Sequence, residues 1–292
     1  MRSLKTREAA ALLSVSPNTL RTWERKFGYP KPTRSPGRHR AYTYAEIVAL
    51  RDALARGLSV PSAISAVREG LGADTEALVT ALASFDLVGA DRAMEASLAL
   101  RSMERSIEEV LLPALDDIRR QDGPTSATWA LAHRWGVDWL GRAQRLTPPA
   151  EPGNGVLIGD ASGGPLAVAG PSIPALELFA RRGGLDVLIL PVEAVSGLPA
   201  ALDAIEPLCV VIAGGGSSDE QVGRWAYAVR QLAGPLPTTL YLRPTRSQGG
   251  DVRMLEGLPI DAHRQLVDLV EESRRAKAGA LEDEANRLAQ PG

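Results

Sequence analysis

Residues 14–28 decide the fold of the first part of the chain, and they read Ser14-Val15-Ser16-Pro17-Asn18-Thr19-Leu20-Arg21-Thr22-Trp23-Glu24-Arg25-Lys26-Phe27-Gly28. The first three residues predict a tight turn, after which Ser16 caps a helix that starts at Pro17. We expect this helix over residues 17–27, because Gly28 suits the left-handed residue that ends many helices. Leu20, Trp23 and Phe27 recur at three- and four-residue spacing and predict its buried face.

A second short helix precedes this turn. Residues 6–13 are rich in alanine and leucine, and Thr6 is the expected N-cap. Two short helices joined by a three-residue turn, the second with polar and basic residues near its start, are typical of a helix-turn-helix. The side chains left on the other faces of the second helix are Asn18, Thr19, Arg21, Thr22 and Arg25.

The stretch after the second helix predicts a hairpin. Three prolines between residues 29 and 36 exclude a helix there, and Pro36-Gly37 is typical of a hairpin tip. The tip is followed by Arg38, His39 and Arg40, with Tyr42 two residues further on. Three potential cations at a hairpin tip fit a wing laid along the phosphate backbone of a nucleic acid. Helices over residues 43–56 and 59–70, the second capped by Ser59, complete this head.

Charge is distributed unevenly along the 292 residues. Residues 1–72 hold 13 Lys and Arg against 5 Asp and Glu, whereas residues 73–292 hold 20 against 30. The formal net charge of −2 hides this contrast. A basic head on an acidic body indicates that the head meets a polyanion. A basic face that is merely solvated is the alternative that charge alone leaves open.

The head resembles a known family of regulators. Residues 16–25, followed at the right distance by Gly37-Arg38-His39-Arg40-Ala41-Tyr42, resemble the winged helix-turn-helix of MerR-family transcriptional regulators. Residues 22–25, Thr-Trp-Glu-Arg, are similar to the subgroup of light sensors whose effector domain binds cobalamin, the CarH/LitR type. A winged helix that binds protein instead of DNA is the alternative.

The resemblance implies a DNA-binding transcriptional regulator that acts on double-stranded DNA as a homodimer or higher homo-oligomer. It implies that the second helix, capped by Ser16, presents these side chains to the major groove: Asn18, Thr19, Arg21, Thr22 and Arg25. It implies that these residues hold phosphates: Arg38, His39, Arg40 and Tyr42 on the wing, flanked by Lys5 and Arg34. RNA polymerase and a small-molecule effector stay open as further partners.

Residues 73–146 predict a helical bundle. β-Branched residues are few and apolar residues recur at helical spacing, while Pro113 and the turn at 122–124 interrupt the pattern, so four helices are expected. The last helix holds Trp129, His133, Trp135 and Trp139. These side chains either form an aromatic seam of the bundle or line a pocket for a flat ligand. Trp129, His133 and Trp135 are therefore candidate ligand-binding residues.

The pattern changes after a proline-rich linker over residues 147–154. Short apolar runs at residues 155–158, 185–190, 208–213 and 238–242 predict buried strands. Helices are expected at residues 174–182, 198–205, 219–232 and 261–278, with an acidic tail as a frayed helix end. Strands that alternate with helices predict a doubly wound parallel sheet, so we expect residues 155–292 to form a Rossmann- or flavodoxin-like α/β domain.

The order of head, bundle, linker and sheet is similar to that of the cobalamin-binding MerR-type regulators, but two features depart from them. In that subgroup a Glu/Asp-x-His-x-x-Gly loop after the first strand supplies the histidine that ligates cobalt. The corresponding loop here, residues 160–171, contains no histidine, and Ala132 replaces the glutamate of a Glu-His pair in which His133 matches the histidine. Imidazole is the good cobalt donor in this chemistry, so we expect no cofactor. A cobalamin-dependent, light-sensing repressor is the alternative.

A glycine loop is the second candidate ligand site, at Ala213-Gly214-Gly215-Gly216-Ser217-Ser218-Asp219. It follows an apolar run and precedes a helix, where backbone N–H groups and the helix dipole favour an anion. In open α/β sheets, ligands bind beyond the carboxyl ends of the strands. The loop has neither the lysine of a Walker motif nor dinucleotide-binding spacing, and a flexible turn with Ser218 or Asp219 as cap explains it equally well. The candidate residues are Gly214, Gly215, Gly216 and Ser217.

Composition narrows the remaining classes of protein. Hydrophobic residues make up 45% and charged residues 23%, as in a soluble protein with a real core. The single cysteine, Cys209, excludes an internal disulfide framework, and three histidines offer little for a transition metal. No apolar run reaches the ~20 residues of a membrane span, so we expect a cytoplasmic, nucleoid-associated bacterial protein. An enzyme with a doubly wound domain is a further alternative, but the C-terminal half offers only Cys209 and His263 for nucleophilic chemistry, and no activity is expected.

Overall fold

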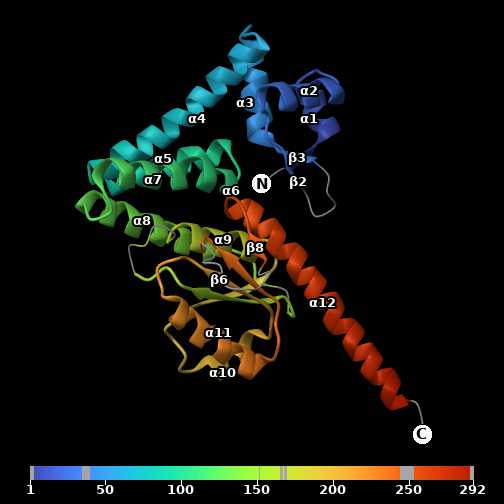
Figure 1. The fold of residues 1–292 in the computed structure, drawn as a ribbon. Helices are drawn as coiled ribbons and strands as arrows, with labels where there is room; N and C mark the ends of the chain where they lie inside the picture. The colour runs from blue at the N-terminus through green and yellow to red at the C-terminus, as the bar shows by residue number, and fades with distance from the viewer. Residues whose placement is uncertain are drawn as a thin grey trace. The chain divides into compact units, whose positions relative to one another are not determined.

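The structure is a computed structural model that describes residues 3–34, 40–150, 152–164, 167, 170–243 and 253–289 (Figure 1). The chain divides into two compact units, Met1–Ala132 and His133–Gly292. The boundary between them falls inside helix α8 (Ala127–Gln144). The finer division that the sequence suggests, at residues 72, 146 and 154, stays a prediction.

The first unit opens with a small antiparallel sheet of β1 (Ser3–Lys5), β2 (Thr33–Arg34) and β3 (Arg40–Thr43), in the order β1-β3-β2. Arg34 lies opposite Arg40, which makes β2 and β3 a hairpin where the sequence predicts one. The tip of that hairpin, residues 35–39, lies outside the described residues. Strand β1 was not expected, because three residues are too few to show the alternation that marks a strand.

Helix α2 (Pro17–Phe27) has the caps that its sequence predicts. The Ser16 hydroxyl accepts the backbone N–H of Thr19 at 3.0 Å, and Gly28 ends the helix in the left-handed region with φ of 63°. Helix α1 (Thr6–Leu12) differs at its start, since Lys5 and not Thr6 is the N-cap residue. The Lys5 N–H donates to the Glu8 carboxylate at 2.7 Å, which moves the first helical residue to Thr6.

Helix α3 (Tyr44–Ala55) and helix α4 (Val60–Ala83) follow. Ser59 caps α4 as predicted, but the helix does not end near Gly70; it continues unbroken for 24 residues. Each glycine inside a helix costs about 1 kcal/mol relative to alanine. Contacts with α3, with α5 (Leu87–Leu100) and with α7 (Leu112–Asp122) stabilise α4 and outweigh this cost.

A π-helical turn interrupts the regular helix pattern of the first unit. Helix α6 (Met103–Ser106), the π-helical turn η1 (Ile107–Leu111) and α7 follow one another without a break. Pro113, which the sequence predicted to interrupt the helix, therefore lies in the first turn of α7. The π-helical turn ends just before Pro113, whose missing backbone N–H removes one hydrogen bond from the continuous helix.

The second unit contains a five-stranded parallel sheet in the order β5-β4-β6-β7-β8. The strands are β4 (Gly155–Asp160), β5 (Asp186–Pro191), β6 (Pro207–Ala213), β7 (Thr238–Tyr241) and β8 (Met254–Leu255). The first four match the predicted apolar runs to within two residues at each end. The two-residue β8 gave no signal of its own in the sequence.

Helices cover both faces of this sheet, as Figure 1 shows. Helix α9 (Ser172–Arg182) and helix α12 (Pro259–Ala289) lie on one face, and α10 (Leu198–Ile205) and α11 (Asp219–Ala233) on the other. Helix α12 is longer than predicted, because it runs on through the acidic tail. No helix in the described ranges combines the length and apolar character that crossing a membrane requires.

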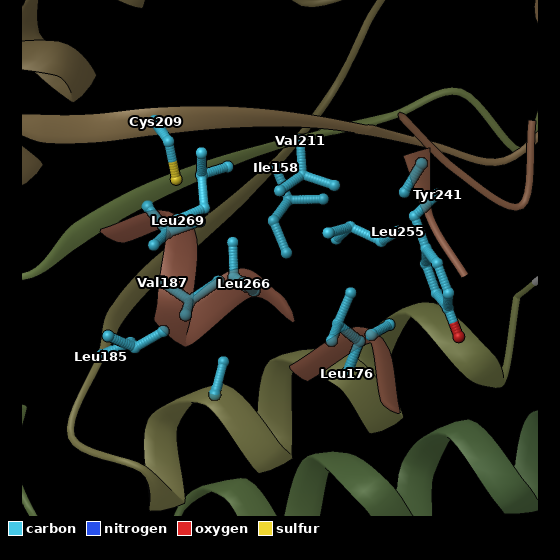
Figure 2. Close-up of a cluster of buried hydrophobic side chains, with 14 of the residues drawn as sticks. Ile158, Leu176, Leu185, Val187, Cys209, Val211, Tyr241, Leu255, Leu266 and Leu269 are labelled. Atoms are coloured by element: carbon cyan, nitrogen blue, oxygen red, sulfur yellow. The ribbon is translucent and has the colours of Figure 1, made fainter. Parts of the chain in front are cut away.

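The face covered by α9 and α12 contains the hydrophobic cluster drawn in Figure 2. Ile158 and Val211 of the sheet meet Leu176 of α9 and Leu266 of α12. Cys209 lies in the same cluster and is fully buried, and its burial raises the pKa of the thiol to about 12. Cys209 is therefore an unreactive core residue, because burial disfavours the thiolate, which is the reactive form of cysteine.

Candidate nucleic-acid interface and C-terminal loops

Helix α2 is amphipathic, with one face in the core of the head and the other in solvent. Leu20 and Trp23 are buried, and they contact the cluster formed by α1, α3 and the small sheet. The opposite face exposes Asn18, Arg21, Thr22 and Arg25, with Thr19 half-buried. The structure thus gathers the predicted contact residues of α2 on one accessible surface.

Short local hydrogen bonds order the beginning of that surface. The hydroxyls of Ser16 and Thr19 lie 2.8 Å apart, and the Thr22 hydroxyl donates to the carbonyl of Asn18 at 2.9 Å. These bonds fix the rotamers of Thr19 and Thr22 against the helix. Arg21 and Arg25 remain exposed and are the long cationic side chains at the centre of this face.

Glu24 of α2 holds the wing against the helix, a role that the sequence analysis missed. Its carboxylate accepts the Arg40 Nε–H at 3.1 Å and the Tyr42 hydroxyl. The only acidic residue between residues 14 and 28 is Glu24, and this isolation among basic residues was the signal available. An anion at this position neutralises Arg40 in part and fixes β3 relative to α2.

Tyr42 differs from its expected role at a phosphate. Its side chain is fully buried in the core of the head, and its hydroxyl donates to Glu24. Burial, followed by the hydrogen bond to Glu24, raises the pKa of Tyr42 above its ordinary value. A buried hydroxyl that is already bonded has no surface to offer a phosphate, so Tyr42 is a packing residue here.

The remaining wing candidates are distributed around the hairpin. Arg40 is exposed on β3 and Lys5 on β1, so both reach solvent on the small sheet. Arg34 belongs to β2, directly before the hairpin tip. Arg38 and His39 lie outside the described residues, so their part in the wing stays a prediction.

In the second unit, the glycine loop after β6 packs against the loop after β4. The carbonyl of Ala161 accepts the N–H groups of Gly216 and Ser217, both at 2.9 Å. A Cβ on Gly216 would overlap the carbonyl of Ser162, and a Cβ on Gly163 would lie 2.6 Å from the Gly216 carbonyl carbon. The glycines thus allow two backbones to approach each other closely.

Side-chain hydrogen bonds also hold the glycine loop in place. The Ser217 hydroxyl donates to Glu193 at 3.0 Å, and the buried Arg243 guanidinium donates to the carbonyls of Gly214 and Ser217 at 3.2–3.3 Å and to the Asp219 carboxylate. Ser218 caps α11 through the N–H of Gln221 at 3.2 Å. The structure therefore favours the turn-and-cap explanation of the glycine loop, because the N–H groups of Gly214, Gly216, Ser217 and Ser218 are already bonded within the chain, as is Arg243.

The three aromatic and imidazole candidates of α8 are all buried. Trp129 belongs to the first unit, and His133 and Trp135 belong to the second. His133 makes a hydrogen bond with the backbone of Ala167, and a Cβ on Gly170 would lie 2.5 Å from its Nε2 atom. Burial lowers the pKa of His133 below its ordinary value, which favours the neutral imidazole. His133 thus packs against one end of the 160–171 loop while the glycine loop packs against the other.

The residues around the switch point of the sheet do not fit cobalamin. The loop over residues 160–171 offers no imidazole, and Ser162 there is hydrogen-bonded to Asp160 through its N–H at 2.9 Å and through its hydroxyl. In this strand order the crevice would open between β4 and β6. Those strand ends are joined by the Ala161 N–H, which donates to the Ala213 carbonyl at 2.7 Å, and by the bonds to Ala161 above.

The candidate metal ligands of the described residues stand apart from one another. Among them, no three His, Cys, Asp or Glu side chains come together in a way that would hold a metal ion. Cys209 lies in the core with a raised pKa, whereas an activated cysteine nucleophile needs a lowered one.

Two comparisons with known proteins concern the head. Residues 5–42 match a family model described as MerR family regulatory protein. Over 72 residues the chain is 40% identical to the HTH-type transcriptional repressor CarA of Myxococcus xanthus. This match covers 23% of the present chain and 25% of that protein, so it concerns about a quarter of each. The exposed polar face of α2 and these matches together identify the N-terminal part of the chain as a MerR-type helix-turn-helix.

Proposed function

We propose that the chain binds operator DNA through residues 1–72, with α2 in the major groove. The observation that carries this proposal is the exposed face of α2, where Asn18, Arg21, Thr22 and Arg25 stand opposite the buried Leu20 and Trp23. An α-helix fits the major groove, and Arg or Asn side chains make bidentate contacts with base edges there. Arg21 is the principal base-reading residue of this proposal, since it lies mid-helix and is exposed.

The wing supplies phosphate contacts in this proposal. Arg40, Lys5 and Arg34 lie on the strands of the small sheet, and we count Arg38 and His39 with them from the sequence alone. Each cation that neutralises a phosphate adds about 0.9 to the slope of log affinity against log salt. The Glu24–Arg40 ion pair orients the Arg40 side chain beside α2. The wing is thus held next to the recognition helix by an anion that does not itself touch DNA.

We infer a winged form of the helix-turn-helix and a two-fold symmetric complex. A homodimer would present two α2 helices to half-sites one helical turn apart, about 34–36 Å. The matched relative is a repressor by name, which favours repression as the mode of action. RNA polymerase and a small-molecule effector stay predictions.

For the second unit we propose a flavodoxin-like domain that works without cobalamin. The strand order β5-β4-β6-β7-β8 corresponds to the order 2-1-3-4-5 of that fold. The hydrogen bonds of Ala161 with Gly216 and Ser217 support this proposal, because they join the two loops at the strand ends where a cofactor would bind. The domain then acts through its surfaces, as an oligomerisation or effector module.

Two measurements test these proposals. Genome-wide binding followed by affinity measurements over a range of salt concentrations should show a preferred palindrome and a steep salt slope. Random DNA bound as well as the best site would contradict the assignment of α2. Absorption spectra of protein purified from cobalamin-fed cells should show no corrin, and a stoichiometric corrin spectrum would restore the light-sensing alternative.

A further inference from the structure

A buried ion pair inside the first unit joins two segments that lie far apart in the sequence. Glu46 of α3 and Arg105 of α6 approach to 2.5 Å, with side chains 2% and 9% exposed. Glu46 follows the wing strand β3 by three residues. Arg105 lies beyond α4 and α5, in the continuous run of α6, η1 and α7 that we call the helical segment. The pair is therefore a polar contact between the head and the helices that follow it.

The same carboxylate also holds the wing stem, by which we mean residues 29–34. Its Oε1 atom accepts the backbone N–H of Lys31 at 3.0 Å, while its Oε2 atom faces Arg105. Tyr29 of the stem is buried in the head core. Glu46 thus touches the stem with one oxygen and the helical segment with the other.

Arg105 is fixed on its own side by further charges. Its Nε and Nη2 atoms donate to the two Glu109 oxygens at 2.8 and 3.0 Å, a bidentate pair. Glu109 belongs to the π-helical turn η1 and lies 3.6 Å from Arg101, which is buried and pairs with Asp74 at 2.7 Å. π-Helical turns are rare and are often found at functional sites. A shift of the helix at η1 would move Arg105 and, through it, Glu46.

Stability alone does not explain this arrangement. Burial raises the pKa of Glu46, and the charge of Arg105 and the Lys31 N–H oppose that rise. A buried ion pair is frequently no more stabilising than a hydrophobic pair of the same volume, whereas removal of one partner is strongly destabilising. The pair therefore gives a defined position to two segments rather than a large gain in stability.

We propose that Glu46 and Arg105 are positioning residues that couple the wing stem to the helical segment, so that the position of α6 sets the position of the wing. Its consequence for DNA affinity rests on the proposed function. The coupling itself concerns the free protein and can be measured without DNA.

The test compares four full-length variants. Arg105→Met removes the cation, and Glu46→Gln removes the anion but keeps an acceptor for the Lys31 N–H. The double variant Glu46→Gln/Arg105→Met leaves no charge at the buried Glu46 position, and Glu109, which is partly exposed, keeps Arg101 at 3.6 Å. It should therefore fold even where Arg105→Met does not. Arg120→Met is the matched control, because Arg120 is exposed and pairs only with Asp116 and Asp117 in the described ion pairs.

Amide hydrogen exchange over residues 29–34 is the primary readout. We expect exchange roughly tenfold faster in the double variant, with a midpoint of thermal unfolding close to that of the wild type and to that of Arg120→Met. Exchange as slow as in the wild type would overturn the proposal, since the glutamine that replaces Glu46 would then suffice to hold the stem without any link to α6.

The DNA measurement is a second, separate readout. If the wild type binds an operator, its affinity should fall about tenfold in the double variant, equivalent to about 1.4 kcal/mol. Faster exchange with unchanged affinity would overturn the positioning role for the wing. Failure of the wild type to bind DNA would contradict the proposed function, and the exchange result would then decide the coupling alone.

Discussion

Two helices of this protein begin in the same way but present different chemistry. Helices α2 and α11 both have a serine N-cap, Ser16 and Ser218, and in both the sequence suggests a binding site. At α2 the exposed side chains remain available to a partner. Before α11 the N–H groups of Gly216 and Ser217 are bonded to the chain's own Ala161 carbonyl. A row of exposed side chains therefore identifies a surface, whereas a row of glycines identifies only a close approach, to a ligand or to another backbone.

The largest expected effect comes from a substitution in the glycine loop before α11. Gly216→Ala would force a Cβ into the carbonyl of Ser162, and such overpacking should lower the free energy of unfolding by roughly 3 kcal/mol. Chemical denaturation measures this change. Gly223→Ala in α11 is the control, because no atom lies within 4 Å of its added Cβ. A Gly216→Ala variant as stable as the wild type would reopen the loop as a ligand site.

The next effect tests the open surface of α2. Arg21→Ala should cost about 1–3 kcal/mol of binding free energy at the operator, if Arg21 makes a bidentate base contact. Its effect on random DNA should be much smaller, which fluorescence anisotropy with both DNAs would show. Equal losses on the two DNAs would make Arg21 a phosphate contact.

A smaller effect on DNA affinity separates packing from DNA contact in the wing. Tyr42→Phe removes the hydroxyl that donates to Glu24, and loss of a hydrogen bond to a charged group should destabilise the head by about 1.5–3 kcal/mol. DNA affinity of the folded variant should change less than about twofold, because Tyr42 is buried and presents no surface to a phosphate. A large loss of affinity at low salt with unchanged stability would return Tyr42 to the phosphate-binding group.

The smallest effect concerns pH and His133. Its folded-state pKa is depressed by burial, so the unfolded chain takes up the proton first as the pH falls. The free energy of unfolding should therefore decrease as the pH falls below about 6.5, and the decrease ends below the folded-state pKa. His133→Gln should flatten this part of the thermal stability profile at mildly acidic pH. Identical profiles for the two proteins would mean that His133 titrates in the fold as it does in the unfolded chain.

The sequence predicts most of this fold because its signals are local. The caps of α2, Ser16 and Gly28, and the apolar runs of β4 to β7 depend on neighbouring residues only. The continuity of α4 depends instead on packing against α3, α5 and α7, which overrides the helix-weakening glycines near residue 70. The exposed residues of α2 could be named in advance for the same reason that its buried face could.

The missed features of the site depend on contacts between distant residues. Glu24 meets Tyr42 across 18 positions, Arg243 meets the glycine loop across 24 to 29, and Glu46 meets Arg105 across 59. Each partner is an ordinary charged or polar residue where it stands in the sequence. Only the tertiary fold gives these side chains their burial and their partners.

The burial of Cys209 has a practical consequence for every experiment that follows motion in this protein. It is the single thiol of the chain, and in the apolar core its pKa of about 12 leaves almost no thiolate near neutral pH. A maleimide dye or spin label would therefore not react with Cys209. Any cysteine introduced on an exposed position, such as Arg120 of α7 or Asn18 of α2, would become the sole site of attachment. Distance measurements on this protein therefore need no prior removal of the native cysteine.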